Sequence, residues 1–424
     1  MRSRFDVVVV GAGMAGLRAA QQLTTHGVSV ALLEARDRIG GRVLSVSSPE
    51  LAEPIELGAE FVHGKAEPTL AIARDAGVRL IDFDDVHFEK RGEKFERLED
   101  AFEPLTRVMQ RLRDDDADVS AATFVEHTDF DELTRARFRH LVEGFVAAPL
   151  AEVSIRSLAS DAPSSAEDAR QQLVEGGYGA LARHLAAQAA AAGAQTMLGT
   201  RVEGIERSSG QLRVACAAHT LQATACVVTL PIGVLSAQGG ARFGLDESSL
   251  RALNQLGMGH AARVNLLFDE DIWSRVVPPE ANFLHHSGAL FETFWWHRVG
   301  SRWLWTAWAG GPNAEKLSRL PASEITHAAV SALATLILLP AETVASQLRA
   351  TYAHDFSNDP YSRGAYSFVR PGGMPARSML SGLTGPVFLA GEGMDDQYPG
   401  TVAGALNSAD AIVPRVLAFL KERG

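Results

Sequence analysis

The sequence has few of the residues that mark secreted, metal-binding or nucleic-acid-binding proteins. Only Cys216 and Cys226 are cysteines, so a disulfide framework is excluded, and nothing nearby completes a metal-ligand cluster. Acidic residues outnumber basic ones by 51 to 40, and the formal charge of -11 argues against sequence-independent nucleic-acid binding. No uninterrupted apolar run approaches the ~20 residues of a membrane helix, and no apolar leader precedes the first expected strand. We therefore expect a cytoplasmic protein that uses no metal, membrane or nucleic acid.

The remaining composition is that of a large globular protein. Hydrophobic residues make up 46% of the chain and charged residues 21%, which rules out intrinsic disorder. A chain of 424 residues is long enough for two or three domains with a sizeable core.

The amino-terminal end has the pattern of a dinucleotide-binding unit. Residues 5–10 form a β-branched run that predicts a buried parallel strand, and it leads directly into Gly-x-Gly-x-x-Gly at 11–16. Residues 17–24 predict a helix, and residues 28–33 predict a second strand that ends at Glu34. A glycine pattern alone is weak evidence, but here the flanking strand, helix and acid are all present.

Each conserved feature of such a unit has a physical reason. Gly11 permits the tight turn, Gly13 lets backbone approach a pyrophosphate, and Gly16 lets the helix pack on the strand. The first turn of the helix then offers N–H groups and a positive dipole end to the phosphates. Glu34 can accept hydrogen bonds from ribose hydroxyls and disfavours a 2′-phosphate, which argues against NADP.

The segment after this acid separates FAD from NAD. Residues 34–42 read Glu-Ala-Arg-Asp-Arg-Ile-Gly-Gly-Arg, a basic, glycine-rich turn that suits a longer dinucleotide in an extended pose. Arg42 can pair with phosphate in a forked geometry. For Arg36 and Arg38, a contact with the cofactor and a solvated loop charge both remain open.

Residues 34–42 resemble the signature of the flavin-dependent amine oxidase family, which includes monoamine oxidases, polyamine oxidases, L-amino-acid oxidases and histone lysine demethylases. The resemblance implies FAD and an α/β fold, a Rossmann-like FAD-binding domain of GR2 type with an interleaved α+β substrate domain. The implied domains are FAD-binding parts at 1–82, 176–255 and 371–424, a helical substrate-domain insertion at 83–175 and a substrate-domain sheet at 256–370.

The middle of the chain predicts a mixture of elements. Residues 83–170 combine dense charge with apolar residues at helical spacing, which predicts several amphipathic helices. A helix is expected up to residue 192, and short strands are expected at 196–202, 214–217 and 226–229. By resemblance, Val202 contacts adenine through its backbone.

Residues 55–64 predict a strand closed by glycine, and they resemble the Gly-Ala-x-x-x-x-Gly segment whose backbone lies along the flavin. The His-Gly ending is most like the polyamine oxidase branch. By that resemblance His63 lies near the substrate amine; the alternative is a surface or packing histidine.

The most distinctive departure from the family is Arg263. Residues 256–268 resemble the strand that usually carries a lysine, held to a water next to flavin N5 and tied to reoxidation by oxygen. This position is Arg263, and no lysine lies between Lys94 and Lys316. Arginine keeps the charge but cannot act as a proton-transfer base. Either fast oxygen reactivity is lost, or an arginine-biased composition has placed this residue here without consequence.

Five of the six tryptophans fall within residues 291–308. The alternation over 303–308 predicts strands. These aromatic faces suit a hydrophobic tunnel or a cation–π contact with an amine, or else the core of the substrate domain.

The carboxyl-terminal end resembles the family again. Tyr366 matches the flavin-facing tyrosine, and Ala365 lies where monoamine oxidases carry the cysteine that bonds flavin, so we expect noncovalent FAD. Residues 387–392 predict an apolar strand that ends in Gly-Glu. By resemblance, this strand and the amino terminus of the helix that follows it contact the cofactor. Thr401 replaces the second aromatic of monoamine oxidases, as in the polyamine oxidase and demethylase branch.

The resemblance thus assigns a set of site residues. The implied catalytic residues are Tyr366, Arg263, His63 and Thr401. The implied cofactor-binding residues are Gly11, Gly13, Met14, Ala15, Gly16, Glu34, Ala35, Arg36, Gly41, Arg42, Leu57, Gly58, Ala59, Glu60, Val202, Gly391, Glu392, Gly400, Thr401 and Val402.

The implied reaction is oxidation of a C–N bond of a primary or secondary amine, either a polyamine or a monoamine. Hydride passes to flavin N5, the imine hydrolyses, and O2 reoxidises the flavin. Three alternatives stay open: an amine dehydrogenase with a non-oxygen acceptor, an L-amino-acid oxidase, and a regulatory protein that keeps flavin without catalysis. The sequence determines neither the amine nor the oligomeric state.

Overall fold

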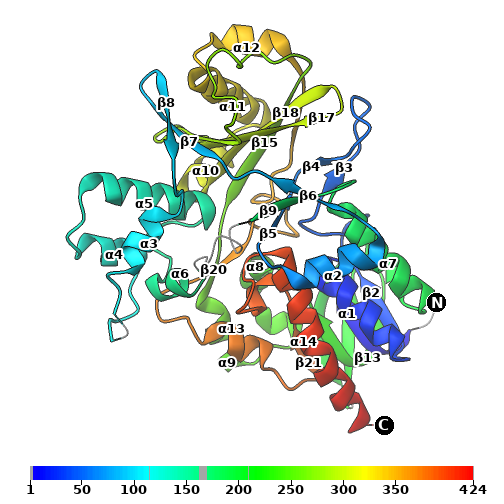
Figure 1. Ribbon diagram of the computed structural model, residues 1–424. Helices are drawn as coiled ribbons and strands as arrows, with labels where there is room; N and C mark the ends of the chain where they lie inside the picture. The colour runs from blue at the N-terminus through cyan, green and yellow to red at the C-terminus, as the bar shows by residue number, and fades with distance from the viewer. Residues whose placement is uncertain (1–2, 114, 162–169, 209, 424) are drawn as a thin grey trace.

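The computed structural model describes residues 3–113, 115–161, 170–208 and 210–423. Two seven-stranded sheets lie one above the other in the view of Figure 1, and a layer of short helices lies at their side. The two ends of the chain both belong to the lower sheet and its helices, whereas the middle of the chain supplies most of the upper sheet. The mixed α/β class expected from the sequence is confirmed.

The lower sheet has the order β10-β2-β1-β13-β12-β11, with β21 paired to β13. Strands β10, β2, β1, β13 and β21 are parallel, and β11 and β12 are antiparallel. The strands are β1 Arg4–Val10, β2 Val30–Leu33, β10 Gln195–Met197, β11 Val202–Ser208, β12 Gln211–Cys216, β13 Thr220–Val228 and β21 Val387–Leu389.

Helices cover both faces of this sheet because its strands are apolar on both sides. Val7 and Val9 face one core with α1, α7 and α14, and Val8 and Val10 face the other core with α8, α9 and α13. The bounds are α1 Met14–Thr25, α2 Glu67–Ala76, α7 Gly179–Ala191, α8 Ile232–Gln238, η1 Gly240–Phe243, α9 Glu247–Asn254, α13 Ala376–Ser381, η2 Glu392–Met394 and α14 Val402–Lys421.

Among the described helices, α14 is long and apolar enough to cross a membrane, and so are α11 (Ala322–Leu336) and α12 (Ala341–Gln347) if the bent pair is taken as one span. Helix α14 packs along α1 and buries Leu406, Ala409 and Ile412 in the core. The core helix of a globular protein has the same length and apolar composition as a membrane span.

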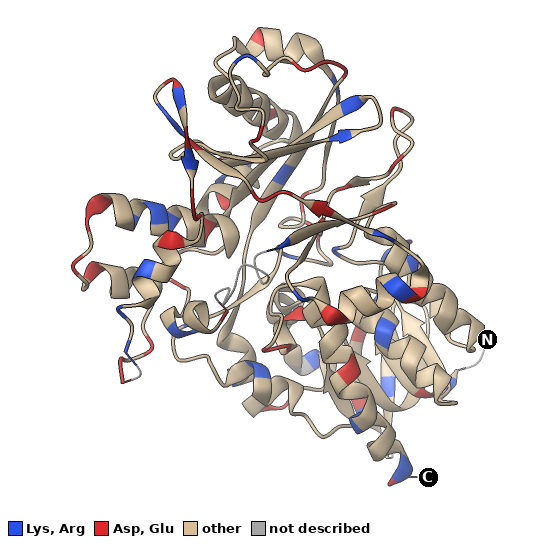
Figure 2. Cartoon of the chain, in the orientation of Figure 1, with Lys and Arg blue, Asp and Glu red and all other residues tan. Residues whose placement is uncertain are grey.

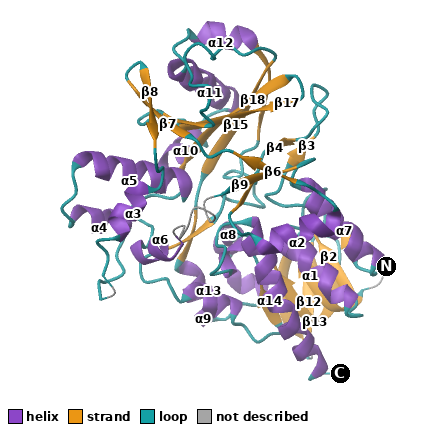
Figure 3. Ribbon diagram, viewed as in Figure 1, coloured by secondary structure: helices purple, strands orange, loops and turns teal. Residues whose placement is uncertain are grey.

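The upper sheet has the order β19-β15-β18-β17-β16-β7-β8. Helices α10, α11 and α12 cover one of its faces (Figure 3). The bounds are β7 His87–Arg91, β8 Lys94–Leu98, β15 Ala261–Phe268, β16 Phe283–His285, β17 Thr293–Val299, β18 Arg302–Gly310, α10 Gly311–Leu317, α11 Ala322–Leu336, α12 Ala341–Gln347 and β19 Leu348–Ala353. The strand predicted over 303–308 is confirmed as part of β18.

Smaller sheets connect the two large ones. Strands β5, β9 and β6 form one of them, in the order β5-β9-β6, and β3–β4 and β14–β20 form antiparallel pairs. The bounds are β3 Ser45–Val46, β4 Ile55–Glu56, β5 Phe61–His63, β6 Leu80–Phe83, β9 Gln171–Val174, β14 Leu256–Met258 and β20 Ser367–Val369.

Two expectations about local structure are wrong. Residues 87–98 are not helical but form the hairpin β7–β8, which closes on Gly92 in the left-handed region at φ +61° and extends the upper sheet. Residues 196–202 are not one strand, because Gly199, at φ +61°, turns the chain between β10 and β11. The strand expected at 55–64 is divided into β4 and β5.

The structure contains helices, as expected for this region, beyond residue 98. The helices are α3 Glu103–Met109, α4 Ala121–Glu126, α5 Glu132–Phe145 and α6 Ile155–Asp161. Ser120 and Asp131 cap α4 and α5 by accepting from the N–H groups of Thr123 and Thr134. Acidic and basic residues are mixed along this layer (Figure 2). Residues 114 and 162–169 of the same prediction lie outside the described residues.

Candidate functional site

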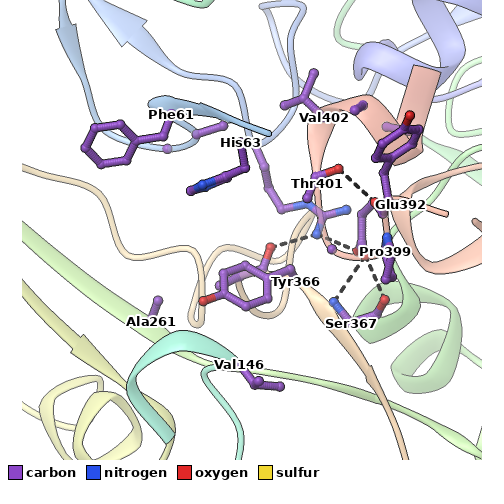
Figure 4. Close-up of a pocket in the computed structure, with 18 of the residues that line it drawn as sticks. Phe61, His63, Val146, Ala261, Tyr366, Ser367, Glu392, Pro399, Thr401 and Val402 are labelled. Carbon is purple, nitrogen blue, oxygen red and sulfur yellow. Dashed lines mark hydrogen bonds and ion pairs between the residues drawn. The ribbon is translucent and has the colours of Figure 1, made fainter. Parts of the chain in front are cut away.

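A cavity of about 900 Å³ extends from the glycine-rich turn after β1 to the aromatic face of the upper sheet. All the site residues expected from the sequence line this cavity, with the exception of Gly16. Figure 4 shows the part of its wall that contains His63, Tyr366, Glu392 and Thr401, contributed by segments far apart in the sequence. The fold thus places the expected cofactor residues and the expected catalytic residues around one space.

The glycine-rich turn has the geometry that a bound dinucleotide phosphate requires. Gly13 precedes α1 in an extended conformation, and no side chain caps this helix. A Cβ built on Gly13 meets nothing within 4 Å, so a side chain there would occupy free space beside the cavity. A Cβ on Gly16 would lie 1.9 Å from the Gly11 carbonyl oxygen. Gly13 therefore leaves room for a ligand, whereas Gly16 permits helix packing.

Two backbone N–H groups fix the Glu34 carboxylate at the end of β2, the position from which an acid binds ribose hydroxyls. Its Oε2 accepts from the Ala12 N–H at 2.8 Å and its Oε1 accepts from the Arg36 N–H at 2.9 Å. The carboxylate is buried but lines the cavity. The open space at Gly13, the uncapped start of α1 and the fixed Glu34 carboxylate therefore fit a dinucleotide.

The arginines of the segment 34–42 are bound by protein groups. Arg36 donates from Nη2 to both carboxylate oxygens of Asp359 at 2.8 Å. Burial raises the pKa of Asp359, but hydrogen bonds from His354 and Arg36 outweigh it and hold that pKa well below its usual range. Arg38 donates to the carbonyls of Ile39 and Gly41. Neither arginine is a solvated loop charge.

Arg42 joins the two ends of the chain at the cavity. It donates from Nη1 to Glu392 at 2.8 Å and to the Ala365 carbonyl at 2.7 Å. The other Glu392 oxygen accepts from the hydroxyl and the N–H of Ser367 (Figure 4). Burial raises the pKa of Glu392, but the charge of Arg42 and the hydrogen bonds from Arg42 and Ser367 lower it by more. The net pKa is therefore below its usual value, and the carboxylate stays ionised.

Tyr366 and Thr401 are both tied to the backbone. The Tyr366 hydroxyl donates to the Phe145 carbonyl at the end of α5, at 2.5 Å, and burial raises the pKa of the phenol. The Thr401 hydroxyl donates to the Tyr398 carbonyl and accepts from the Gly404 N–H, so it caps α14. A capping role was not foreseen from the sequence.

His63 lies on the cavity wall between aromatic rings. Its ring centroid is 6.0 Å from that of Phe61 and 6.3 Å from that of Phe145. This enclosure lowers the pKa of His63, against a weaker opposing effect of Asp85. The imidazole is therefore neutral at neutral pH and open to the cavity.

Arg263 is immobilised in a buried network. Alternation along β15 places Arg263 and Asn265 on the face opposite α11, where Asn265 donates to the Glu56 carbonyl on β4. Arg263 donates to Glu60 at 2.9 Å, to the Gly58 carbonyl at 3.1 Å and to Asn265 at 3.1 Å. Trp295 donates to the same Glu60 oxygen at 2.9 Å. Arg263 and Glu60 are each only 5% exposed, so this charge is fixed in place.

Glu56 lies beside this network and is a buried acid that forms no ion pair with an arginine among the described residues. Burial raises its pKa to about 7, in spite of hydrogen bonds from Ser45 and the Tyr178 N–H. A raised pKa means that the folded state holds a proton that the unfolded chain releases near pH 4.5.

We therefore predict that Glu56 destabilises the fold as pH rises from about 4.5 to 7, by up to about 3 kcal/mol. In Glu56→Gln this contribution is absent, so the variant should gain stability relative to the wild type over the same interval. Denaturant unfolding at several pH values measures the difference. A difference that stays constant between pH 4.5 and 8 would show that Glu56 does not titrate as its burial requires.

The sequence did not point to a second polar cluster on the cavity wall. His87, His140 and His285 meet at the end of the cavity near β7 and β16, together with Glu89 and Arg137. These residues come from a hairpin, a helix and a strand, and they form no local motif. The available signal was Gly92, a turn residue between two short runs that contain Phe88 and Phe95, because it is compatible with a hairpin that could bring them together.

A dinucleotide-binding sheet that shares one cavity with an aromatic-lined second sheet defines a two-domain oxidoreductase of the flavoprotein type. The family model described as flavin containing amine oxidoreductase matches residues 14–417. The chain belongs to this family, which implies a flavin cofactor.

Curated relatives include demethylases and polyamine oxidases. The chain is 27% identical to human lysine-specific histone demethylase 2, over 98% of this chain and 53% of that protein, and so spans about half its length. It is 27% identical to polyamine oxidase 2 of Arabidopsis thaliana, over 95% of this chain and 86% of that protein.

Solved structures share the fold. Putrescine oxidase bound to putrescine matches with a TM-score of 0.81 at 18% identity, over 98% of this chain and 99% of that one. Cyclohexylamine oxidase from Brevibacterium oxydans IH-35A matches with a TM-score of 0.82 at 18% identity, over 99% of both chains.

Proposed function

We propose that this protein is an FAD-dependent oxidoreductase that oxidises a C–N bond of a primary or secondary amine, with FAD held noncovalently. The observation that carries the proposal is the single cavity, which joins the glycine-rich turn at Gly13 to the aromatic wall around Trp295. Ala365 offers no side-chain nucleophile for a covalent bond to flavin. When bound, FAD supplies the acceptor for the two electrons that leave the amine.

The protein's own contribution is to bind the cofactor and to orient the amine. The α1 amino terminus and Arg42 would hold phosphate, and Glu34 would hold ribose hydroxyls. Tyr366 would align the amine, because its hydroxyl is fixed to Phe145 and its ring lines the cavity. Neutral His63 can accept a proton from the ammonium form of the substrate, and the apolar wall favours the resulting uncharged amine, whose lone pair assists oxidation.

A second candidate is an amine dehydrogenase that passes electrons to an acceptor other than oxygen. The observation that favours it is Arg263, at the position of the family's lysine. Arginine keeps the positive charge of the lysine, but a guanidinium does not serve as a proton-transfer base. An L-amino-acid oxidase and a flavin protein without catalysis remain as outcomes of the same experiment.

Anaerobic mixing of the purified holoprotein with amines of different classes tests the proposal. We expect bleaching of the flavin absorbance by monoamines or polyamines, and slow recovery of colour in air would favour the dehydrogenase. Bleaching by L-amino acids alone would identify an L-amino-acid oxidase. Protein that is colourless and whose melting temperature does not respond to added FAD would refute the proposal.

A further inference from the structure

The wall of the cavity is aromatic up to the histidine cluster. Phe283 contacts Phe61 and Trp295, with ring centroids 6.0 Å apart in each pair. His87 stacks on Phe283 at 4.6 Å and 9°, and His285 stacks on His87 at 5.1 Å and 3°. An amine body that lies along this wall would therefore place its far end at the histidines.

The hydrogen bonds of the cluster run in one direction. His87 Nε2 lies 2.7 Å from Asp85 Oδ1, so it carries a proton and donates to the carboxylate. His87 Nδ1 then accepts from His285 Nε2 at 2.8 Å. His285 Nδ1 accepts from the Thr293 hydroxyl at 3.2 Å. Burial and the two neighbouring imidazoles hold the pKa of His285 well below its usual range, so this ring is neutral.

Arg137 is the charged group that this end of the cavity presents. Glu89 Oε2 accepts from Arg91 at 2.9 and 3.1 Å and from Arg137 at 2.9 Å. Arg91 also pairs with Glu96 at 3.0 Å, so Arg91 is shared between two carboxylates. Within the described part of the chain, Arg137 donates only this one bond, which leaves donors on Nε and Nη1. Arg137 lines the cavity, whereas Arg91 does not. The end of the cavity therefore favours an oxygen acceptor and opposes a second ammonium.

The position of this end relative to Tyr366 limits the length of the ligand. Arg137 and His140 are three residues apart on α5 and share one face of the helix. His140 precedes Phe145 by about 7.5 Å along the helix axis. The Phe145 carbonyl in turn accepts from Tyr366. A benzene ring with a two-carbon linker to the amine spans a comparable distance.

We propose that Arg137 and His140, with His285 behind them, form a subsite that binds an oxygen-bearing group, a hydroxyl or a carboxylate, at the far end of the amine and selects against a second ammonium. The inference rests on the proposed function and narrows its substrate class to aryl or alkyl monoamines with a distal oxygen. Asp85 and Glu292 are acids beside the cluster without an arginine partner among the described residues, but neither lines the cavity: Asp85 accepts from His87 at 2.7 Å, and Glu292 Oε2 lies 3.3 Å from His140 Nδ1. Neither presents to the cavity the carboxylate that the second ammonium of a diamine would need.

Matched para-substituted phenethylamines test the subsite: the unsubstituted amine and its hydroxy, carboxy and aminomethyl derivatives. We expect the hydroxy or carboxy compound to reduce the flavin at least about tenfold more efficiently than the aminomethyl compound, because a hydrogen bond to a charged group is worth about this factor or more. The hydroxy and carboxy arms identify which oxygen group is preferred.

Arg137→Met should reduce this ratio to about twofold or less. Arg139→Met is the matched control: it removes the same charge from the same helix at an exposed residue that does not line the cavity, and the ratio should persist. If Arg137→Met does not fold, Arg137→Gln replaces it. A wild-type preference for the aminomethyl compound, or a ratio unchanged by loss of Arg137, would overturn the subsite.

Failure of the proposed function gives a different result. If no amine bleaches the flavin, that function fails, and the subsite is then judged from equilibrium binding of the same compounds, followed by the visible spectrum of the holoprotein. The same order of affinity would support the subsite, and an equal or reversed order would refute it.

Discussion

Arg263→Met is expected to destabilise the protein by about 3–5 kcal/mol, since it leaves the Glu60 carboxylate buried without its ion-pair partner. Glu60 would retain only the bond from Trp295, and the Gly58 carbonyl and Asn265 would each lose a donor. Denaturant unfolding of the purified holoprotein measures the loss as a lower midpoint.

The double variant Arg263→Met with Glu60→Gln separates the ion pair from the packing. Removing both charges should restore most of the lost stability, because the cost comes from the unpaired buried charge. Arg349→Met is a matched control in the same sheet: Arg349 pairs with Glu50 at an exposed site, so its loss should change the midpoint little. Equal losses for Arg263 and Arg349 would contradict the importance of burial.

Arg263→Lys addresses chemistry with the same residue. Lysine keeps the charge but presents a compact ammonium, which cannot serve all three acceptors of Arg263 at once. We expect a smaller loss of stability than in Arg263→Met and, if the position governs oxygen reactivity, faster recovery of flavin colour in air. Unchanged recovery in a folded, flavin-loaded variant would show that arginine here has no bearing on the choice of acceptor.

The sequence predicts best where one short segment determines both structure and chemistry. The strand, glycine turn, helix and acid between residues 4 and 34 are contiguous, and each has one backbone conformation that suits it. Helix α1 nevertheless begins at Met14 rather than at Leu17, because Gly13 already supplies the extended residue that opens it. The aromatic strand at 303–308 was equally readable from its alternation.

The rest of the site depends on contacts that no local pattern encodes. The bond from Tyr366 to Phe145 joins residues 221 positions apart, and that from Arg263 to Glu60 joins residues 203 apart. The histidine cluster required recognition of β7 as a strand, but the dense charge of 87–98 resembled an exposed helix. In the folded protein, this segment is a strand because β7 pairs with β16, a contact between residues far apart in the sequence.

The largest expected effect on the cofactor is at Gly13, where Gly13→Val should weaken flavin binding strongly while the protein still folds. Gly13 has φ -73° and ψ -179°, a conformation that valine adopts readily, and a Cβ there meets nothing within 4 Å. The added methyl groups would instead occupy the space that phosphate needs beside the α1 amino terminus. We expect FAD affinity to fall on the order of a hundredfold, consistent with overpacking of a close contact.

Gly16→Ala distinguishes this effect from disruption of the fold. Its Cβ would lie 1.9 Å from the Gly11 carbonyl oxygen, so strand and helix would have to separate. We therefore expect Gly16→Ala to lower the unfolding midpoint measured without flavin, and Gly13→Val to leave that midpoint close to the wild-type value while the purified protein is colourless. Gly13→Val protein that retains stoichiometric flavin would mean that the dinucleotide phosphates lie elsewhere, because no phosphate can approach the helix through a valine side chain.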